Sequence, residues 1–337
     1  MRREDKTIKI LLYYGLLAGG GCERRMGDLC RWLLDAGDEC WIVASGAYDT
    51  ALTILCGHCR VPANRILYMP PGGVFEDFLN ETAANLEADV IDHQWWGAGI
   101  PKDGFAKPAI CTLHGLVTPP PAGYYKGIIS VETLHDEHAM RALTPNYQVI
   151  WNWVNLDRFP FREELGESAA FFGRSFKMIN AFKVAEHWPG MIDCYGMASE
   201  ALPEFPPNME WHGFADTAEV MPRYRVIFGS AQVVLEAMAA GRFVIAGQGY
   251  FIDTVPAGHL VTPENVDALA QNQFYCERRG DPELKERTSL EVYADFQWAM
   301  ENDLPEERRY LRQWVESYHS MDTQCGRIRQ LYEECIG

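Results

Sequence analysis

The alternation of short apolar runs, glycines and amphipathic segments constrains the fold of this chain more than any other feature. It is clearest near the start, where residues 9–14 and 40–44 are apolar runs and residues 22–34 carry apolar side chains at helical spacing. Three consecutive glycines, residues 19–21, follow the first run. Strand, glycine turn, helix and strand predict a βαβ unit, and such units build parallel sheets with helices on both faces.

The same alternation continues in two series. Apolar runs begin at residues 66, 90, 109, 127 and 148, and a second series begins at residues 169, 191, 226 and 243. Between them, residues 156–168 are charged and contain Pro160. A chain of 337 residues is also longer than one core usually supports. We therefore predict an α/β protein of two doubly wound parallel-sheet domains, residues 1–155 and 156–305, with a charged helical segment at 306–337.

Composition excludes several classes of partner. A formal net charge of −17 disfavours a protein that binds nucleic acid, because that affinity depends on clustered Lys and Arg. The sequence has no run of about 18 apolar residues, so we do not expect a membrane span. The acidic net charge weakens attraction to anionic lipids. The ten cysteines show no regular spacing, which is typical of a reducing compartment. We expect a cytoplasmic protein with at most peripheral membrane contact.

Two local patterns allow other interpretations. The basic start and the apolar residues 10–18 imitate a signal peptide, although the amphipathic helix that follows at once favours a buried strand. Cys56-Gly57-His58-Cys59 matches the active-site tetrapeptide of disulfide isomerases, in which a helix N-terminus lowers the pKa of one thiol. A thiol oxidoreductase acting through Cys56 and Cys59 is therefore a remote alternative.

Residues 229–245 are the most informative segment for function. Gly229 and Ser230 form a short turn between an apolar strand and a helix, and Ser230 is the expected N-cap. Backbone amides there would be open to a phosphate at the positive end of the helix dipole. Glu236 lies one to two turns into the helix, from which a carboxylate can accept hydrogen bonds from a ribose. The same residues also make a good helix without any ligand, so the pattern alone leaves both interpretations open.

Residues 235–241, Leu-Glu-Ala-Met-Ala-Ala-Gly, resemble the donor-binding motif of family-4-type retaining GT-B glycosyltransferases. Further similar segments occur in order along nearly the whole chain, at residues 19–24, 89–93, 112–115, 149–159, 172–177, 211–214 and 258–265. The resemblance implies a GT-B fold, in which two Rossmann-like domains face a cleft and a C-terminal helix returns to the first domain. It also implies transfer of a sugar from a nucleotide-sugar donor to an unidentified acceptor, with retention of configuration.

The resemblance assigns the donor contacts. It implies that Glu236 binds the nucleotide ribose and that Gly229 and Ser230 lie at the donor phosphates. Gly20 and Gly21 belong to a first glycine loop whose amides approach the donor phosphates or the acceptor. Three glycines in a row exceed what an ordinary turn needs, which favours close approach of a ligand.

The catalytic group expected from the resemblance is His114, Arg174 and Lys177, with Lys183 as a substitute for Lys177. A departing nucleoside diphosphate gains negative charge, so these cations would stabilise the transition state more than the ground state. The sequence has no Asp-X-Asp pair to hold a metal at the phosphates. We therefore expect neither a metal ion nor another cofactor.

Two further residues, His93 and Gln232, are expected at the substrate. Trp95 and Trp96 follow His93 and would either stack on a sugar ring or pack at a domain interface. One departure weakens the resemblance, because Phe228 occupies the position where the family has a Glu that contacts the donor sugar. Two alternatives therefore stay open: a GT-B protein that binds nucleotide without catalysis, and a nucleotide-sugar epimerase, which needs no acceptor.

Overall fold

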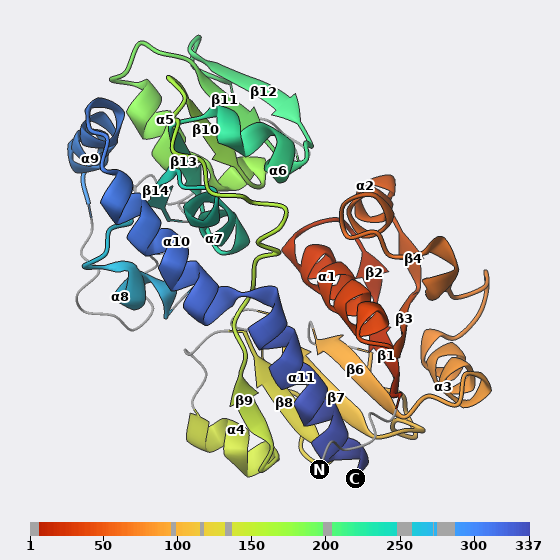
Figure 1. The fold of residues 1–337 in the computed structure, drawn as a ribbon. Coiled ribbons are helices and arrows are strands. Elements are labelled where there is room, and N and C mark those ends of the chain that lie inside the picture. The colour runs from red at the N-terminus through yellow and green to blue at the C-terminus, as the bar shows by residue number, and fades with distance from the viewer. Residues whose placement is uncertain are drawn as a thin grey trace. The chain divides into compact units, whose positions relative to one another are not determined.

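The computed structural model describes residues 7–95, 99–114, 118–131, 137–197, 204–247, 258–271, 273–274 and 287–337. The chain forms two compact units (Figure 1). Unit 1 comprises residues 1–152 and 321–337, and unit 2 comprises residues 153–320. Each unit is built around its own largely parallel sheet. The predicted fold class, an α/β protein with two doubly wound parallel-sheet domains, is confirmed.

The units divide at residues 152 and 320, whereas we expected the domain boundary at 155 and the returning segment from 306. Residues 306–319 lie in helix α10 (Pro305–His319), which packs against α7 (Gln232–Ala239) of unit 2. Leu311, Trp314 and Val315 of α10 join the hydrophobic core of that unit. Of the segment that we expected to return to the first domain, only helix α11 (Met321–Ile336) belongs to unit 1.

The sheet of unit 1 has seven parallel strands in the described residues, in the order β5-β3-β1-β6-β7-β8-β9. The strands are β1 (Lys9–Tyr13), β3 (Glu39–Ala44), β5 (Ile66–Tyr68), β6 (Val90–Trp95), β7 (Ala109–Leu113), β8 (Gly127–Ser130) and β9 (Tyr147–Val149). Every residue of β6 and β7 is buried, which fits the mostly apolar sequence of β7, whereas β6 also buries the polar residues 92–94. The strand order reverses between β1 and β6, and open α/β sheets bind ligands beyond the carboxyl ends at such a switch point.

Helices and a small two-stranded ribbon surround this sheet. They are β2 (Leu16–Leu17), α1 (Gly21–Asp35), β4 (Gly46–Ala47), α2 (Asp49–Leu52), α3 (Phe75–Asn85), α4 (Glu137–Leu143) and α11. Helix α11 packs against α1, β6 and β7 (Figure 1). Arg329 of α11 pairs with Asp38 at 2.7 Å, and the Tyr332 hydroxyl donates to buried Asp92 at 2.6 Å. The end of the chain is thereby fixed to unit 1.

Within the residues that the structure describes, the sheet of unit 2 has the order β12-β11-β10-β13-β14-β15, with only β15 antiparallel to its neighbour. The strands are β10 (Ala169–Phe172), β11 (Ile192–Tyr195), β12 (Met209–Gly213), β13 (Val226–Gly229), β14 (Phe243–Ala246) and β15 (His259–Leu260). Its strand order reverses between β10 and β13, as that of unit 1 does between β1 and β6.

Helices cover both faces of the second sheet. They are α5 (Ile179–Ala185), α6 (Thr217–Val220), α7, α8 (Val266–Ala270), α9 (Ser289–Glu301) and α10. Alternate residues of β10 enter different cores, since Phe171 packs with α5 and α9 while Phe172 packs with α7 and α10. Burial on both faces explains why β10 is apolar at every position.

Candidate functional site

The carboxyl edge of the unit 2 sheet is a row of glycines. Each of the five parallel strands ends on a glycine or is followed by one: Gly173, Gly196, Gly213, Gly229 and Gly247. Hydrogen bonds link them, from Gly196 N to Gly213 O at 2.8 Å and from Gly247 N to Gly229 O at 3.0 Å. A ligand can approach the backbone closely where strand ends carry no side chains. Gly173, Gly213 and Gly229 lay within the segments that the sequence singled out, whereas Gly196 and Gly247 did not.

Crowding shows why two of these positions require glycine. A Cβ at Gly196 would lie 1.8 Å from the carbonyl oxygen of Gly173. A Cβ at Gly229 would lie 2.4 Å from Cγ1 of Val233 and 3.4 Å from the carbonyl oxygen of Phe172. The second contact also places the end of β13 beside the end of β10, at the switch point of this sheet.

The start of α7 lies at this switch point and has no side-chain cap. Ala231, rather than Ser230, is the N-cap residue, because the turn after β13 places Ala231 at φ 50°. The Ala231 N–H donates to the Gln273 carbonyl at 2.8 Å. The first turn of α7, all of it within the described chain, contains no acidic residue. The positive end of the α7 dipole therefore has no carboxylate in the first turn of its own helix to offset it.

Glu236 points its carboxylate toward α6. It is 3% exposed, and its Oε2 accepts a 2.8 Å hydrogen bond from the Thr217 hydroxyl. Its Oε1 lies 3.4 Å from Nε2 of Gln232, which also donates to the Trp153 carbonyl at 2.7 Å. These contacts hold the carboxylate of Glu236, the residue predicted to bind the ribose, in one orientation. They also bring Gln232 beside Glu236.

Arg174 and Lys177 follow β10 directly. Arg174 is the exposed N-cap residue of a short 3-10 helix (Ser175–Lys177), and half-buried Lys177 is its last residue. Among the described residues, the Arg174 guanidinium forms no ion pair. Lys183 lies on α5 and pairs with Glu186 at 2.7 Å. Arg174 and Ser230 thus follow neighbouring strands, whereas Lys183 is already engaged on a helix surface.

The glycine loop of unit 1 differs from that of unit 2. The Glu23 carboxylate in the first turn of α1 accepts hydrogen bonds from the N–H groups of Ala18 at 2.8 Å and Gly19 at 3.0 Å. Gly20 is extended, and a Cβ at Gly21 would meet nothing within 4 Å. The chain therefore supplies its own anion at this helix start, although Gly21 faces open space.

His93 lies in an aromatic cluster of unit 1. Its buried ring stacks on Tyr13 with 4.4 Å between centroids, and its Nδ1 is 2.8 Å from the Tyr125 hydroxyl. The buried Trp95 indole donates to the Thr118 carbonyl at 2.8 Å. Both side chains therefore pack within unit 1, and Trp96 lies outside the described residues.

His114 follows β7 and is 6% exposed. Its Nε2 lies 2.7 Å from Oε1 of Gln94, and because a carboxamide oxygen only accepts, this contact places the proton on Nε2. Burial, with a smaller contribution from Arg25, lowers the pKa of His114 well below 6.5. The imidazole is therefore neutral at physiological pH. The next residue of its motif, Gly115, lies outside the described residues.

A buried polar network beneath His114 is the part of unit 1 that the sequence prediction missed. Asp92 is fully buried and accepts from the Thr112 hydroxyl at 2.7 Å and from Tyr332 at 2.6 Å. Burial raises the pKa of Asp92, although its hydrogen-bond partners and the charge of Arg25 oppose the rise. The signal was present as an acid within an apolar strand, but its partners come from distant segments.

The predicted thiol site lacks the electrostatics of a redox centre. Cys56 is exposed and Cys59 is buried, and no disulfide joins the two. Cys56 lies inside a π-helix (Thr53–His58) that continues α2, so it is not at a helix N-terminus as expected. Burial raises the pKa of the Cys56 thiol, whereas a reactive thiol needs a lowered pKa.

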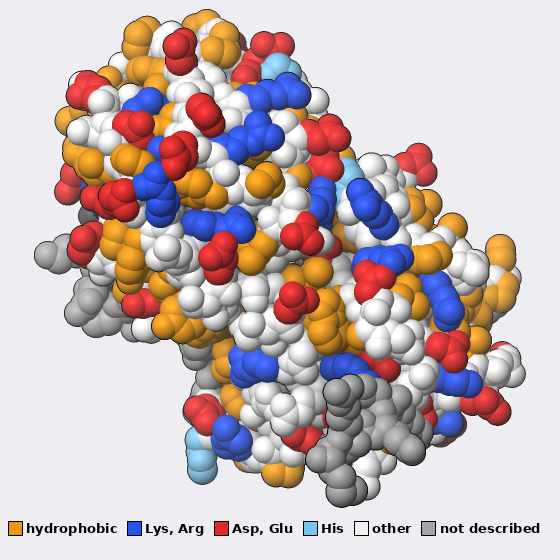
Figure 2. Space-filling view, in the orientation of Figure 1, with side chains coloured by type: hydrophobic (Ala, Val, Ile, Leu, Met, Phe, Trp, Pro, Cys, Tyr) orange, Lys and Arg blue, Asp and Glu red, His pale blue; other side chains and the backbone are white. Residues whose placement is uncertain are grey.

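The surface carries side chains of both charges. On the face shown in Figure 2, Lys and Arg side chains are interspersed with Asp and Glu. Within the described residues, no helix has the length and apolar character needed to cross a bilayer.

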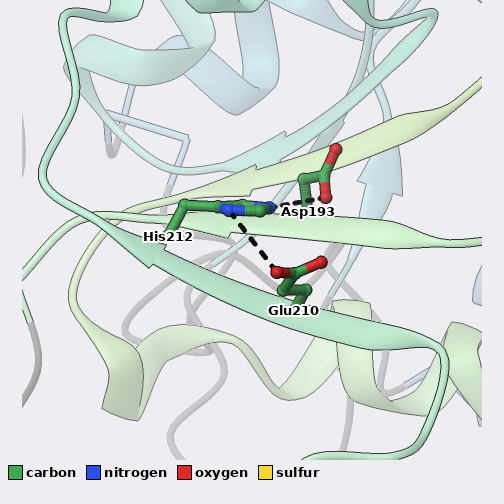
Figure 3. A group of neighbouring side chains, drawn as sticks. All are labelled: Asp193, Glu210 and His212. Atoms are coloured by element: carbon green, nitrogen blue, oxygen red, sulfur yellow. Dashed lines mark hydrogen bonds and ion pairs between the residues drawn. The ribbon is translucent and has the colours of Figure 1, made fainter.

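One described group, Asp193, Glu210 and His212 on β11 and β12, could hold a metal ion (Figure 3). These three residues were not among the predicted site residues.

No family model and no curated protein matches the sequence. Solved structures, however, match the fold of this chain. A glycosyltransferase from Rickettsia africae ESF-5 shares 16% identity at a TM-score of 0.66, over 98% of this chain and 99% of that chain. The pneumococcal O-GlcNAc transferase GtfA in complex with UDP and GlcNAc shares 10% identity at a TM-score of 0.61, over 98% and 99%.

A second kind of enzyme has the same architecture. The UDP-GlcNAc 2-epimerase from Neisseria meningitidis bound to UDP-GlcNAc shares 10% identity at a TM-score of 0.58, over 96% of this chain and 100% of that chain. At such identities the similarity shows the fold alone. The chain therefore has the GT-B fold, with two Rossmann-like domains, that these transferases and epimerases share.

Proposed function

We propose that this protein is a glycosyltransferase that binds a nucleotide-sugar donor at the carboxyl edge of unit 2 and transfers the sugar to an acceptor at unit 1. The observation that carries the proposal is the glycine row, together with exposed Arg174 after β10 and the uncapped start of α7 after β13. The similarity in fold to a transferase in complex with UDP and GlcNAc supports a nucleotide-sugar as the ligand.

The proposed phosphate contacts match the charge that develops in the reaction. As the bond between sugar and diphosphate breaks, negative charge accumulates on the leaving oxygen. Arg174 and Lys177 would neutralise this charge, and backbone amides near Gly229 and Ser230 would donate hydrogen bonds to the phosphates. Since these groups can do so without a metal ion, we expect transfer to continue after EDTA treatment.

Glu236 and Gln232 are the proposed ribose and sugar contacts. Their hydrogen bonds to Thr217, to Trp153 and to each other orient both side chains before any donor binds. A preoriented carboxylate loses less entropy when it accepts hydroxyl hydrogen bonds. The start of α6 thereby becomes part of the proposed donor site.

The proposed acceptor site is the carboxyl edge of unit 1, with His114 as its catalytic residue. A neutral imidazole with its proton on Nε2 keeps Nδ1 as the hydrogen-bond acceptor. His93, Gly20 and Gly21 belong to the same edge, and a Cβ at Gly21 would meet nothing within 4 Å. Retention of configuration is carried over from the family resemblance.

An epimerase remains the second candidate, because UDP-GlcNAc 2-epimerases share this fold. It would use the same donor edge but would need no acceptor. Incubating the protein with a nucleotide-sugar alone distinguishes the two functions, since an epimerase yields an isomeric nucleotide-sugar whereas a transferase leaves the sugar unchanged.

A binding protein without catalysis is the third candidate, and Phe228 motivates it. This side chain is 1% exposed and stacks on Phe296 of α9 with 5.7 Å between ring centroids. It belongs to the hydrophobic core, so no carboxylate can reach a donor sugar from this position. We propose that the Gln232 carboxamide contacts the sugar instead, and wild-type turnover by Gln232→Ala would contradict this assignment.

The test begins with thermal stabilisation by UDP, GDP, ADP and their sugar conjugates, because specific ligands raise stability by mass action. Wild type is compared with Glu236→Ala, and Glu186→Ala on the surface of α5 serves as a control. One nucleotide that stabilises wild type and the control but not Glu236→Ala supports the donor site. Equal responses in all three proteins, or no response to any nucleotide, would contradict it.

A further inference from the structure

A second polar group of unit 2 lies on the outer strands β11 and β12, next to Gly213 of the glycine row, and includes none of the proposed donor side chains. Asp193 and Glu210 are direct partners in the parallel ladder. The register then shifts, so that Tyr195 pairs with Gly213 and His212 becomes the extra residue of a bulge. Figure 3 shows the His212 imidazole lying between the two carboxylates.

The distances around this imidazole suit a metal ion. Its Nε2 lies 2.7 Å from Oδ1 of Asp193, and its Nδ1 lies 4.0 Å from Oε1 of Glu210. If Nε2 of His212 donates its proton to Asp193, then Nδ1 carries a lone pair that faces the carboxylate of Glu210. Both of these facing groups are electron-pair donors, so a cation can bind between them. Zinc binds nitrogen and carboxylate oxygen at about 2.0–2.2 Å, so an ion between these atoms would contact both.

We propose that His212 and Glu210 bind a divalent transition-metal ion of the zinc class, and that Asp193 orients the imidazole. Metal-binding histidines usually donate their other ring N–H to a carboxylate, which fixes the tautomer. Imidazole with carboxylate favours zinc, cobalt or nickel over magnesium and calcium, which prefer oxygen ligands alone. The two carboxylates also give the group the net negative charge that attracts a cation.

Neighbouring side chains hold the imidazole and Asp193 in place. The Tyr224 hydroxyl donates to Oδ2 of Asp193 at 2.7 Å and lies 2.7 Å from the Tyr195 hydroxyl. The Tyr195 ring stacks on His212 with 5.0 Å between ring centroids. It also stacks on Phe172, with 5.1 Å between ring centroids. Ligands whose orientations are fixed by packing bind metal more tightly than mobile ones.

The group is also accessible to an ion. The side chains of Asp193 and His212 are 23% and 32% exposed, whereas that of Glu210 is 63% exposed. Glu210 therefore has room to adjust its bond to the ion, and water can complete the coordination shell. A bound ion would join β11 to β12, so its direct effect is expected on the stability of unit 2. The proposal does not depend on the glycosyltransferase function.

Cobalt titration of the full chain, pretreated with a chelator, tests the proposal. We expect one Co²⁺ per chain to give visible absorption without a thiolate-to-cobalt band, since no cysteine takes part, and one Zn²⁺ to displace it. His212→Ala should abolish the signal, Glu210→Gln should weaken binding at least tenfold, and Asp193→Asn should weaken it less. His187→Ala, an exposed histidine of the same unit, is the matched control.

Two outcomes would overturn the proposal. One is Co²⁺ binding that is equal in wild type, His212→Ala and Glu210→Gln. The other is no binding, or displacement of cobalt by Mg²⁺ or Ca²⁺ as readily as by Zn²⁺. Circular dichroism of each variant checks folding, and because Glu210 is largely exposed, Glu210→Gln retains its value as a test even if His212→Ala fails to fold.

Discussion

The two sheets of this protein share the order of their first five strands, including the reversal at the first strand of each unit, but their carboxyl edges differ. In unit 2 each of the five parallel strands ends on a glycine or is followed by one, and exposed Arg174 comes after the glycine that follows β10. In unit 1 the strand ends carry His93, Gln94 and His114, which are buried and hydrogen-bonded. The same topology has therefore produced one edge that leaves room for a ligand and another that presents side chains.

The helix starts at the two edges repeat this contrast. Glu23 satisfies two amides before α1, whereas α7 begins without a cap or an acidic residue in its first turn. A helix start that carries its own carboxylate competes with an incoming phosphate, and one without it attracts the phosphate. The difference favours unit 2 for the donor and unit 1 for the acceptor.

The largest effect is expected from Arg174→Ala. Loss of one group that stabilises charge in the transition state typically lowers kcat by about 100- to 1,000-fold. The side chain is exposed, so the melting temperature should not change. Steady-state transfer kinetics measure the effect, and Lys183→Ala, which removes a cation already paired on α5, is the control. A near-wild-type rate for Arg174→Ala would contradict the assignment of the donor phosphates to unit 2.

Gly196→Ala and Gly21→Ala compare the two edges directly. The added methyl at Gly196 would collide with the Gly173 carbonyl, so we expect a loss of about 1–3 kcal/mol in the free energy of unfolding and weaker nucleotide binding. The methyl at Gly21 meets nothing within 4 Å, and its effect on stability should stay within about 0.5 kcal/mol. Urea unfolding measures both, and equal losses would show that the contrast in crowding is wrong.

The free energy of unfolding should depend on pH because His114 is buried at the carboxyl edge of unit 1. The pKa of His114 is lowered in the folded state, so the unfolded chain binds more protons below about pH 6.5. Its contribution to stability is therefore complete above that pH and is lost on acidification, by up to about 1.4 kcal/mol per pH unit. His114→Gln should flatten this part of a urea-unfolding profile between pH 8 and 5. An unchanged slope would contradict the lowered pKa.

The smallest effects concern the helix starts. Glu23→Gln removes the charge from the start of α1 and should cost about 0.5–1 kcal/mol of stability. Ser230→Asp adds a charge near the start of α7, so it should leave stability nearly unchanged but weaken nucleotide binding severalfold. Thermal shifts with and without nucleotide measure both substitutions. Tighter nucleotide binding by Ser230→Asp would reverse the contrast between the two units.

Local patterns were enough to predict the elements of the fold. The apolar runs at residues 9–14, 40–44 and 226–229 became β1, β3 and β13, because strands covered on both faces are apolar at every position. The helix that carries Glu236 was predicted in the same way, from its composition and from Gly241 at its end. Such signals lie within one or two turns of chain, where sequence neighbours are also neighbours in space.

Long-range packing decided the rest. Asp92 and Tyr332 are 240 positions apart, and only the packing of α11 against β6 and β7 brings them together. The glycine row and the pairing of His212 with Asp193 likewise depend on which strands become neighbours and in what register. The sequence by itself determined where strands and helices form, because that follows from local periodicity. Strand order, register and buried partners were decided only by the tertiary structure, because they depend on which distant surfaces bury the most apolar area together.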